Sequence, residues 1–273
     1  MRFYVRGSQA QLTWPLPALL ALWVLTMIVQ PILLWTWGQA ALQRGLTVAV
    51  LVQATTVLAM LVQAWGPKRS ARTLVIVVTI AFLAEWVGSR TGFPFGSYHY
   101  TDVLQPQLAG VPLLIPLAWM MMLPPAWAVA HLLTGRSSRD ARFVLLAALA
   151  ITLWDLFLDP QMVGWNIWVW EQPGPYFGIP LVNFPGWFLV SALITWITGP
   201  RDLPTSPLML VYAITWLLQT IGQGLFWSQP GPALFGFLGM GVLVSLAWKP
   251  TLLRGKRSLK PGRAGKTGGG HAD

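Results

Sequence analysis

Long apolar segments separated by short polar ones dominate the sequence, and their lengths predict membrane-spanning helices. A helix needs about 20 mostly apolar residues to cross the hydrocarbon core of a bilayer. We therefore predict an all-α fold, a polytopic membrane bundle of about eight transmembrane helices, with seven as the alternative, over residues 1–254. A disordered basic tail is predicted for residues 255–273. The apolar segments, of which the sixth and eighth are the shortest, cover residues 15–37, 46–65, 72–89, 111–134, 141–160, 184–199, 206–227 and 232–248.

Composition supports a membrane protein and removes several classes of chemistry. The chain is 55% hydrophobic and only 10% charged, whereas soluble domains carry about 25% charged residues. Cysteine is absent, which excludes disulfides, thiolate nucleophiles and cysteine metal sites. The first apolar segment is long enough to span a bilayer and lacks a small-residue cleavage site, so we expect no cleavable signal peptide.

The basic residues predict the orientation of the helices. The net charge is +10, but Lys and Arg lie at helix ends and in the tail, which argues against a nucleic-acid-binding face. With a cytoplasmic N-terminus, only Arg44 and Arg90 of the 18 Lys and Arg residues fall on the outer side. This distribution satisfies the positive-inside rule. We predict an integral protein of the cell membrane with both termini cytoplasmic and a tail suited to anionic lipid.

Three acids lie within predicted membrane helices. A carboxylate in hydrocarbon costs about 2.5–3.5 kcal/mol, so these acids require an explanation. Asp155 and Asp159 are four residues apart and share a helix face. Glu85 lies near the end of the third segment, which runs in the same direction as the fifth, so all three acids are expected in the outer half of the bilayer. Pro160 is expected to end the fifth helix at Asp159.

The predicted surroundings of these acids favour their neutral form. Burial, a neighbouring carboxylate and the negative end of a helix dipole each disfavour the anion. We expect at least one carboxyl group to keep its proton near neutral pH and the aspartate pair to titrate as a unit. A solvated or structural role, such as capping Arg90, is the alternative for each acid taken singly.

Two loops with similar aromatic sequences are predicted to open on the acid-bearing side. They cover residues 90–110 and 161–183, and each precedes an apolar helix with an early tryptophan. We predict that both loops cap one site. Aromatic faces stabilise cations by about 0.5–2 kcal/mol. The alternative for any tryptophan is a place in the aromatic girdle at the membrane interface. To that girdle we assign Trp14, Trp35, Trp37 and Trp65. The candidate substrate-binding residues are Tyr98, Trp119, Trp168, Trp170, Tyr176, Phe177, Asn183 and Trp187.

Other familiar sites are missing from the sequence. We find no glycine-rich phosphate loop, no Ser-His-Asp set and no histidine-rich metal site. Asp155 and Asp159 match half of the Mg²⁺-diphosphate motif of membrane prenyltransferases, but a second aspartate-rich motif is absent. We therefore predict no metal and no cofactor.

The acid and loop residues resemble those of the CruF-type carotenoid 1′,2′-hydratases, which are membrane proteins of carotenoid biosynthesis. The similarity covers about residues 82–190 and is specific only when its pieces are taken together. The similar residues are Gly92 to Thr101, Gly110 to Pro112, Ile115 to Trp119, Asp155, Asp159 to Met162, Trp168, Trp170, Tyr176 to Pro180, Asn183, Gly186 and Trp187.

The resemblance implies addition of water to the terminal double bond of an acyclic ψ end group, as in lycopene, γ-carotene or a related polyene. We expect Asp155 or Asp159 to be the general acid, and the other carboxylate or Glu85 to position water and accept its proton. Asn183 and Tyr98 are candidate water-holding groups, and Trp168, Trp170 and Trp187 would line the cation. Expected partners are the carotenoid in the bilayer, membrane lipids and, as a further option, other carotenoid-pathway enzymes.

Two other functions fit the same residues. A membrane lycopene cyclase uses the same protonation but quenches the cation with an internal alkene. A proton-coupled transporter or a non-enzymatic lipid-binding protein also fits, because intramembrane acids form proton relays. Clustering of the acids near one face of the membrane argues against the transporter.

Overall fold

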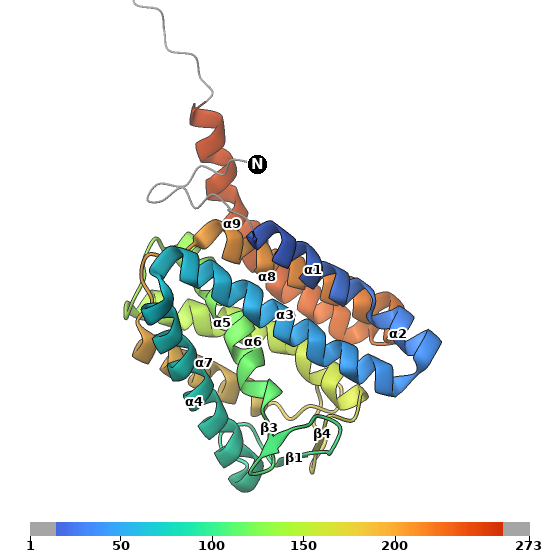
Figure 1. The fold of residues 1–273 in the computed structure, drawn as a ribbon. Helices are drawn as coiled ribbons and strands as arrows, with labels where there is room; N and C mark the ends of the chain where they lie inside the picture. Colours follow the sequence, from blue (N-terminus) through green and yellow to red (C-terminus); the bar gives the residue numbers. More distant parts are fainter. Residues whose placement is uncertain (1–14, 259–273) are drawn as a thin grey trace, which may run out of the picture.

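The computed structural model describes residues 15–258, which form a bundle of helices with four short strands at one end (Figure 1). Each of the eight predicted apolar segments is helical, so the predicted all-α polytopic fold is confirmed. The helical elements are α1 (Leu16–Ile28), α2 (Gln30–Trp37), α3 (Gln39–Trp65), α4 (Pro67–Thr91), α5 (Leu114–Thr134), α6 (Ala141–Gly164), α7 (Asn183–Thr198), α8 (Thr205–Ile221), the π-helix η1 (Gly222–Phe226) and α9 (Pro230–Ser258).

The number of spans is close to the prediction. In the described part of the chain, six helices are long and apolar enough to cross a membrane, counting α8 together with η1. The pair α1 and α2 makes a seventh if it is one span, bent by 41°. Pro31 stands in the first turn of α2, where a residue without a backbone N–H is tolerated. The sixth predicted segment forms α7, which has only 16 residues and falls short of a full span.

Some predictions concern residues outside the described range. Residues 1–14, with Trp14, and residues 259–273, with most of the predicted tail, lie outside it. The helix α9 extends to Ser258, so the first four residues of the predicted tail are helical. The cytoplasmic location of both termini stays a prediction.

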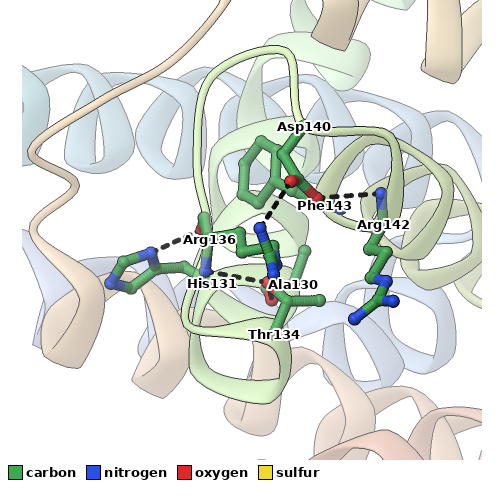
Figure 2. A network of polar contacts seen from close by, with 7 residues as sticks. All are labelled: Ala130, His131, Thr134, Arg136, Asp140, Arg142 and Phe143. Carbon is green, nitrogen blue, oxygen red and sulfur yellow. Dashed lines mark hydrogen bonds and ion pairs between the residues drawn. The ribbon is translucent and has the colours of Figure 1, made fainter.

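One end of the bundle carries the basic connection between α5 and α6 (Figure 2). The Asp140 carboxylate caps α6 by accepting hydrogen bonds from the backbone N–H groups of Arg142 (3.0 Å) and Phe143 (3.4 Å). Its second oxygen lies 3.0 Å from Nη1 of Arg136. The carbonyl oxygen of Arg136 is 2.7 Å from Nδ1 of His131. Aspartate is a preferred N-cap residue because it satisfies amide groups that lack a helical partner.

Other basic connections meet at the same end of the bundle. Arg69 forms an ion pair with Asp202 (3.3 Å) and donates to the carbonyl oxygen of Arg201 (2.7 Å). Nε of Arg201 donates to Oγ of Ser138 in the α5–α6 connection (3.1 Å). Connections that the charge pattern assigns to the inner side therefore lie together in space.

The short strands lie at the opposite end of the bundle and join the two aromatic loops (Figure 1). Strand β1 (Tyr98–Tyr100) from the first loop pairs antiparallel with β4 (Trp168–Trp170) from the second. In this register Tyr98 lies opposite Trp170. A smaller hairpin, β2 (Gln107–Leu108) and β3 (Val111–Pro112), leads into α5. The two loops therefore meet at one end of the bundle, as their predicted capping of one site requires.

The predicted end of the fifth helix at Asp159 is wrong, because α6 continues through Pro160 to Gly164. Proline has no backbone N–H and leaves the carbonyl four residues earlier without its helical partner. Here that carbonyl belongs to Leu156, and the Tyr176 hydroxyl donates to it at 3.0 Å. Nε2 of Gln223 donates to the next carbonyl oxygen, that of Phe157. Side chains from other elements therefore hold the helix past the proline.

Replacing Tyr176 by Phe is expected to lower the free energy of unfolding by about 1 kcal/mol. A buried carbonyl left without a partner costs about 1–3 kcal/mol, and the lower end of that range applies because this site is only partly buried. Burial raises the pKa of Tyr176 above its ordinary range, so the hydroxyl stays a donor. Thermal unfolding in detergent measures the change. In a Pro160→Ala background the Leu156 carbonyl regains a backbone donor, so Tyr176→Phe should lower the stability less there. An equal loss of stability in both backgrounds contradicts the role of Tyr176 as the replacement donor.

Candidate active site

The three predicted acids are buried near one another at the strand-bearing end of the bundle. None of Glu85, Asp155 and Asp159 is more than 4% exposed. Glu85 comes from α4, and both aspartates come from α6. The described residues show no ion pair between these acids and a Lys or Arg side chain. The hydrogen bonds that these carboxyl groups accept from other side chains therefore all come from neutral donors.

One amide joins the two aspartates. Nδ2 of Asn183, the first residue of α7, lies 2.7 Å from Oδ2 of Asp155 and 2.5 Å from Oδ2 of Asp159. An amide nitrogen carries two hydrogens, so one side chain can donate to both carboxyl groups. The other oxygen of Asp159 accepts from Nε1 of Trp168 at 2.6 Å. Oδ1 of Asp155 is buried and has no hydrogen-bond partner within the described residues.

Glu85 is held by three donors. The hydroxyl groups of Tyr98 and Tyr100 donate to its Oε2 at 2.5 Å and 2.8 Å. Nε1 of Trp119 donates to its Oε1 at 3.0 Å. Burial first, and then the charge of the Glu85 carboxylate, raise the pKa of Tyr98 and Tyr100 well above the ordinary value for tyrosine. Both hydroxyl groups therefore remain protonated donors at physiological pH.

The pairing of β1 with β4 positions these side chains. Alternate residues of a strand share a face, so Tyr98 and Tyr100 both point toward Glu85. Across the strand pair, the rings of Tyr98 and Trp170 are 5.1 Å apart and those of Tyr100 and Trp168 are 6.0 Å apart. The two strands thus connect the donors of Glu85 with the donor of Asp159.

A second aromatic group comes from the helices that follow the two loops. The indole rings of Trp119 and Trp187 stack with centroids 4.1 Å apart and an interplanar angle of 5°. Trp154 meets Trp187 edge-on at 6.0 Å, and Phe95 lies 6.4 Å from it. The two early tryptophans that the sequence singled out are therefore direct neighbours.

These groups surround a cavity of about 510 Å³. That volume lies within the range of small-molecule sites, about 300–1,000 Å³. Asp155 does not line the cavity and lies behind Asn183, whereas Asp159 does line it. The predicted site residues in its wall are Glu85, Tyr98, Trp119, Asp159, Trp168, Trp170, Asn183 and Trp187. The wall is otherwise mostly apolar, so the cavity presents carboxyl groups to a hydrophobic ligand.

Two predicted substrate-binding residues lie elsewhere. Tyr176 donates to the Leu156 carbonyl, and Phe177 is half exposed and packs against Tyr176 and Phe235. Neither belongs to the cavity wall. Tyr176 supports α6 through this hydrogen bond, and Phe177 packs beside it against α9.

The expected effect of the helix dipole on the acids also requires correction. The helix α4 ends at Thr91 and α6 ends at Gly164. Glu85 and Asp159 therefore lie more than one turn before the ends of their helices, and the dipole effect fades within the last turn. Of the three predicted effects, burial and the neighbouring carboxyl groups therefore remain.

The cavity wall also contains residues that the sequence analysis missed. Tyr100 could have been found, because it lies two residues after Tyr98 in an extended segment and must share its face. Trp154 had no such signal, because a tryptophan beside Asp155 in sequence points to a different side of the helix. Gln53 and Thr215, which are 3.4 Å apart across α3 and α8, had no local signal either. In the described range, no group of three His, Cys, Asp or Glu side chains is placed to hold a metal ion.

Comparisons with known proteins bear on the whole bundle. Residues 45–244, which include all three acids and both loops, match the protein family described as "Carotenoid biosynthesis protein". The chain is 31% identical over 187 residues to the bisanhydrobacterioruberin hydratase of Haloarcula japonica. That alignment covers 64% of this chain and 64% of the relative, so the chain spans less than two thirds of the relative's length. No solved structure matches the chain.

Proposed function

Because the chain belongs to the carotenoid biosynthesis protein family, we propose that it is a carotenoid 1′,2′-hydratase of the CruF type. The family predicted from the sequence is confirmed, and the hydratase named among its relatives supports the proposal. The observation that carries it is Asp159, a buried carboxyl group in the wall of a mostly apolar cavity that several aromatic rings line. The substrate class is a carotenoid with an acyclic ψ end group, such as lycopene or γ-carotene.

The reaction needs only an acid, a base and a protected cation. A carboxyl proton moves to C2′ of the terminal double bond, and a tertiary cation forms at C1′. Water then bonds to C1′ through its oxygen and returns one proton to a carboxylate, so the acid is regenerated. The product is a tertiary alcohol heavier than the substrate by one water. General acid–base participation of this kind contributes about 10²–10⁴-fold.

Asp159 is the proposed acid and Asp155 its partner. Asp159 faces the cavity, while Asp155 lies behind Asn183, which donates to both. Two carboxyl groups that share one amide, with no cation paired to them in the described chain, favour a single proton held by the pair. The pair then delivers that proton through Asp159 and recovers it from water.

Glu85 suits a different step. Its two oxygens accept three hydrogen bonds, from Tyr98, Tyr100 and Trp119, one more than Asp159 accepts, and none of these donors links it to a second acid. We assign Glu85, with the two tyrosine hydroxyl groups, to positioning the attacking water. Hydroxyl groups both donate and accept, which allows them to hold a water molecule next to Glu85.

The stacked tryptophans are assigned to stabilising the cation. Replacing Trp187 by Leu is expected to lower the rate about tenfold, because an aromatic face stabilises a cation by about 0.5–2 kcal/mol and about 1.4 kcal/mol corresponds to tenfold in rate. Initial rates of hydration in membranes measure the effect. Trp196→Leu is the control, because it makes the same change at an exposed position of the same helix. Equal rates for the two variants contradict the assignment.

Expression in a host that accumulates lycopene tests the function. Pigments are extracted, separated and weighed by mass spectrometry. A product heavier by one water supports the hydratase. A new pigment of unchanged mass supports a cyclase instead, and unaltered lycopene in the presence of well-expressed protein refutes both enzymes and favours a transporter or lipid-binding protein.

A further inference from the structure

The cavity has an opening whose position follows from exposure. Neighbouring residues that line a cavity and are also exposed mark the side on which the cavity approaches the surface. All exposed residues of the cavity wall are apolar and come from two places, the bent pair α1–α2 and the α8–η1 junction. We call these residues the mouth: Ile28, Ile32, Trp35, Ile221 and Phe226.

The surface around the mouth is also apolar. Leu25 precedes Ile28 by one turn of α1, and Leu225 precedes Phe226 in η1; both side chains are exposed and neither lines the cavity. Both elements that frame the mouth belong to candidate membrane spans. An apolar surface on a membrane span is suited to the acyl chains of the bilayer, which favours a mouth that opens sideways into lipid.

Both elements that frame the mouth are irregular. The helices α1 and α2 meet at an angle of 41°, and η1 is a π-helix. Short π-helical segments are frequently found at functional sites. The rings of Trp35 and Phe226 reach across the opening and meet edge-on with centroids 5.7 Å apart. This ring pair bridges the two elements at the mouth.

We infer that the mouth is the entrance through which a long apolar polyene passes from the bilayer into the cavity, end group first. A 510 Å³ cavity has the volume of a site for a drug-sized molecule, so it holds the end group and part of the chain of a carotenoid. The rest of the chain extends past Trp35 and Phe226 into the bilayer. The identity of the polyene rests on the proposed function, whereas the position of the entrance rests on the exposed wall residues.

Site-directed labelling tests the entrance, because the chain contains no cysteine of its own. Ile32→Cys places a thiol in the mouth, and Leu25→Cys places one at a neighbouring exposed position that does not line the cavity; the native side chains are 49% and 61% exposed. The full-length variants are labelled with a bulky maleimide in detergent and returned to liposomes that contain lycopene. After repurification, absorbance gives the amount of lycopene bound per protein.

We expect labelled Ile32→Cys to bind at least tenfold less lycopene than the unlabelled variant, and labelled Leu25→Cys to bind as much as its unlabelled form. Equal binding by labelled and unlabelled Ile32→Cys, or no binding by the unmodified protein, overturns the inference. Phe226→Cys with Leu225→Cys as its control repeats the test on η1 if Ile32→Cys does not fold. Hydration of lycopene is measured separately. A protein that binds lycopene without hydrating it refutes the proposed function. The position of the entrance is then still decided by comparing the labelled and unlabelled variants.

Discussion

Replacing Asp159 by Asn is expected to lower the rate of carotenoid hydration by about 10²–10⁴-fold, the usual contribution of a general acid or base. Asparagine keeps the shape of the side chain, and its one oxygen can still accept a hydrogen bond from Trp168 or from Asn183, but it cannot act as a Brønsted acid. Asp159 is the aspartate that lines the cavity, so its loss removes the group that meets the alkene. Initial rates with lycopene in membranes, normalised to the amount of folded protein, measure the effect.

The same substitution at Asp155 is expected to have a smaller effect, about tenfold, because Asp155 acts on the alkene only through the shared proton. Glu171→Gln is the control, because Glu171 follows β4 directly, is exposed and lies outside the cavity wall. If Asp155→Asn and Asp159→Asn both hydrate lycopene at the wild-type rate, neither carboxyl group is the acid. A larger loss at Asp155 than at Asp159 reverses the roles proposed for the two aspartates.

The sequence predicted that Asp155 and Asp159 lie together, because helix geometry alone places them on one face. Residues four apart in a helix face the same way, which places Asp155 and Asp159 together and lets one amide reach both. The similar sequences of the two loops also indicated that the loops lie close together in the structure. The structure pairs a strand from each loop, β1 with β4, and it stacks Trp119 and Trp187 from the helices that follow the loops.

The continuation of α6 past Pro160 could not be predicted from local sequence. The proline rule is correct about the lost hydrogen bond, but the rule cannot see that Tyr176 and Gln223 supply donors from elsewhere in the chain. The helix boundary therefore depends on tertiary contacts. The same contact explains why Tyr176, which the sequence suggested as a substrate-binding residue, lies outside the cavity.

The mouth could not be predicted from the sequence either, because it also depends on tertiary contacts. Trp35 was assigned to an interfacial girdle, which is the usual role of an exposed tryptophan near the end of a span. Its place in the cavity wall depends on Phe226, which is nearly two hundred residues away in sequence and meets it only in the folded bundle. Hydropathy gives the apolar character of such residues but not the arrangement of helices that opens a cavity between them.

The two acids that line the cavity, Glu85 and Asp159, have different surroundings, and this difference suggests different roles. Glu85 in the first unit accepts three hydrogen bonds, whereas Asp159 in the second accepts two and is linked to a further acid. Both line the same cavity. Glu85 is thus a carboxyl group with three donors that is suited to orienting water, and Asp159 with Asp155 forms a linked pair that is suited to exchanging a proton.

Replacing Asn183 by Asp is expected to lower the rate of hydration at least a hundredfold. The change removes two hydrogen bonds to carboxyl groups, each worth about 1.5–3 kcal/mol, and places a third carboxyl group within hydrogen-bond distance of the other two. Asn166→Asp is the control, because it makes the same chemical change at an exposed loop position. Initial rates and the yield of folded protein are measured together.

A double substitution separates positioning by Asn183 from a general need for that side chain. Asp155→Asn combined with Asn183→Asp restores two carboxyl groups and one amide, with their positions exchanged. We expect this exchange to recover at least tenfold of the rate lost in Asn183→Asp, since residues in direct contact show coupling of about 0.5–3 kcal/mol. An exchanged protein that folds but is no faster than Asn183→Asp shows that Asn183 has a role other than dividing its amide between the two acids.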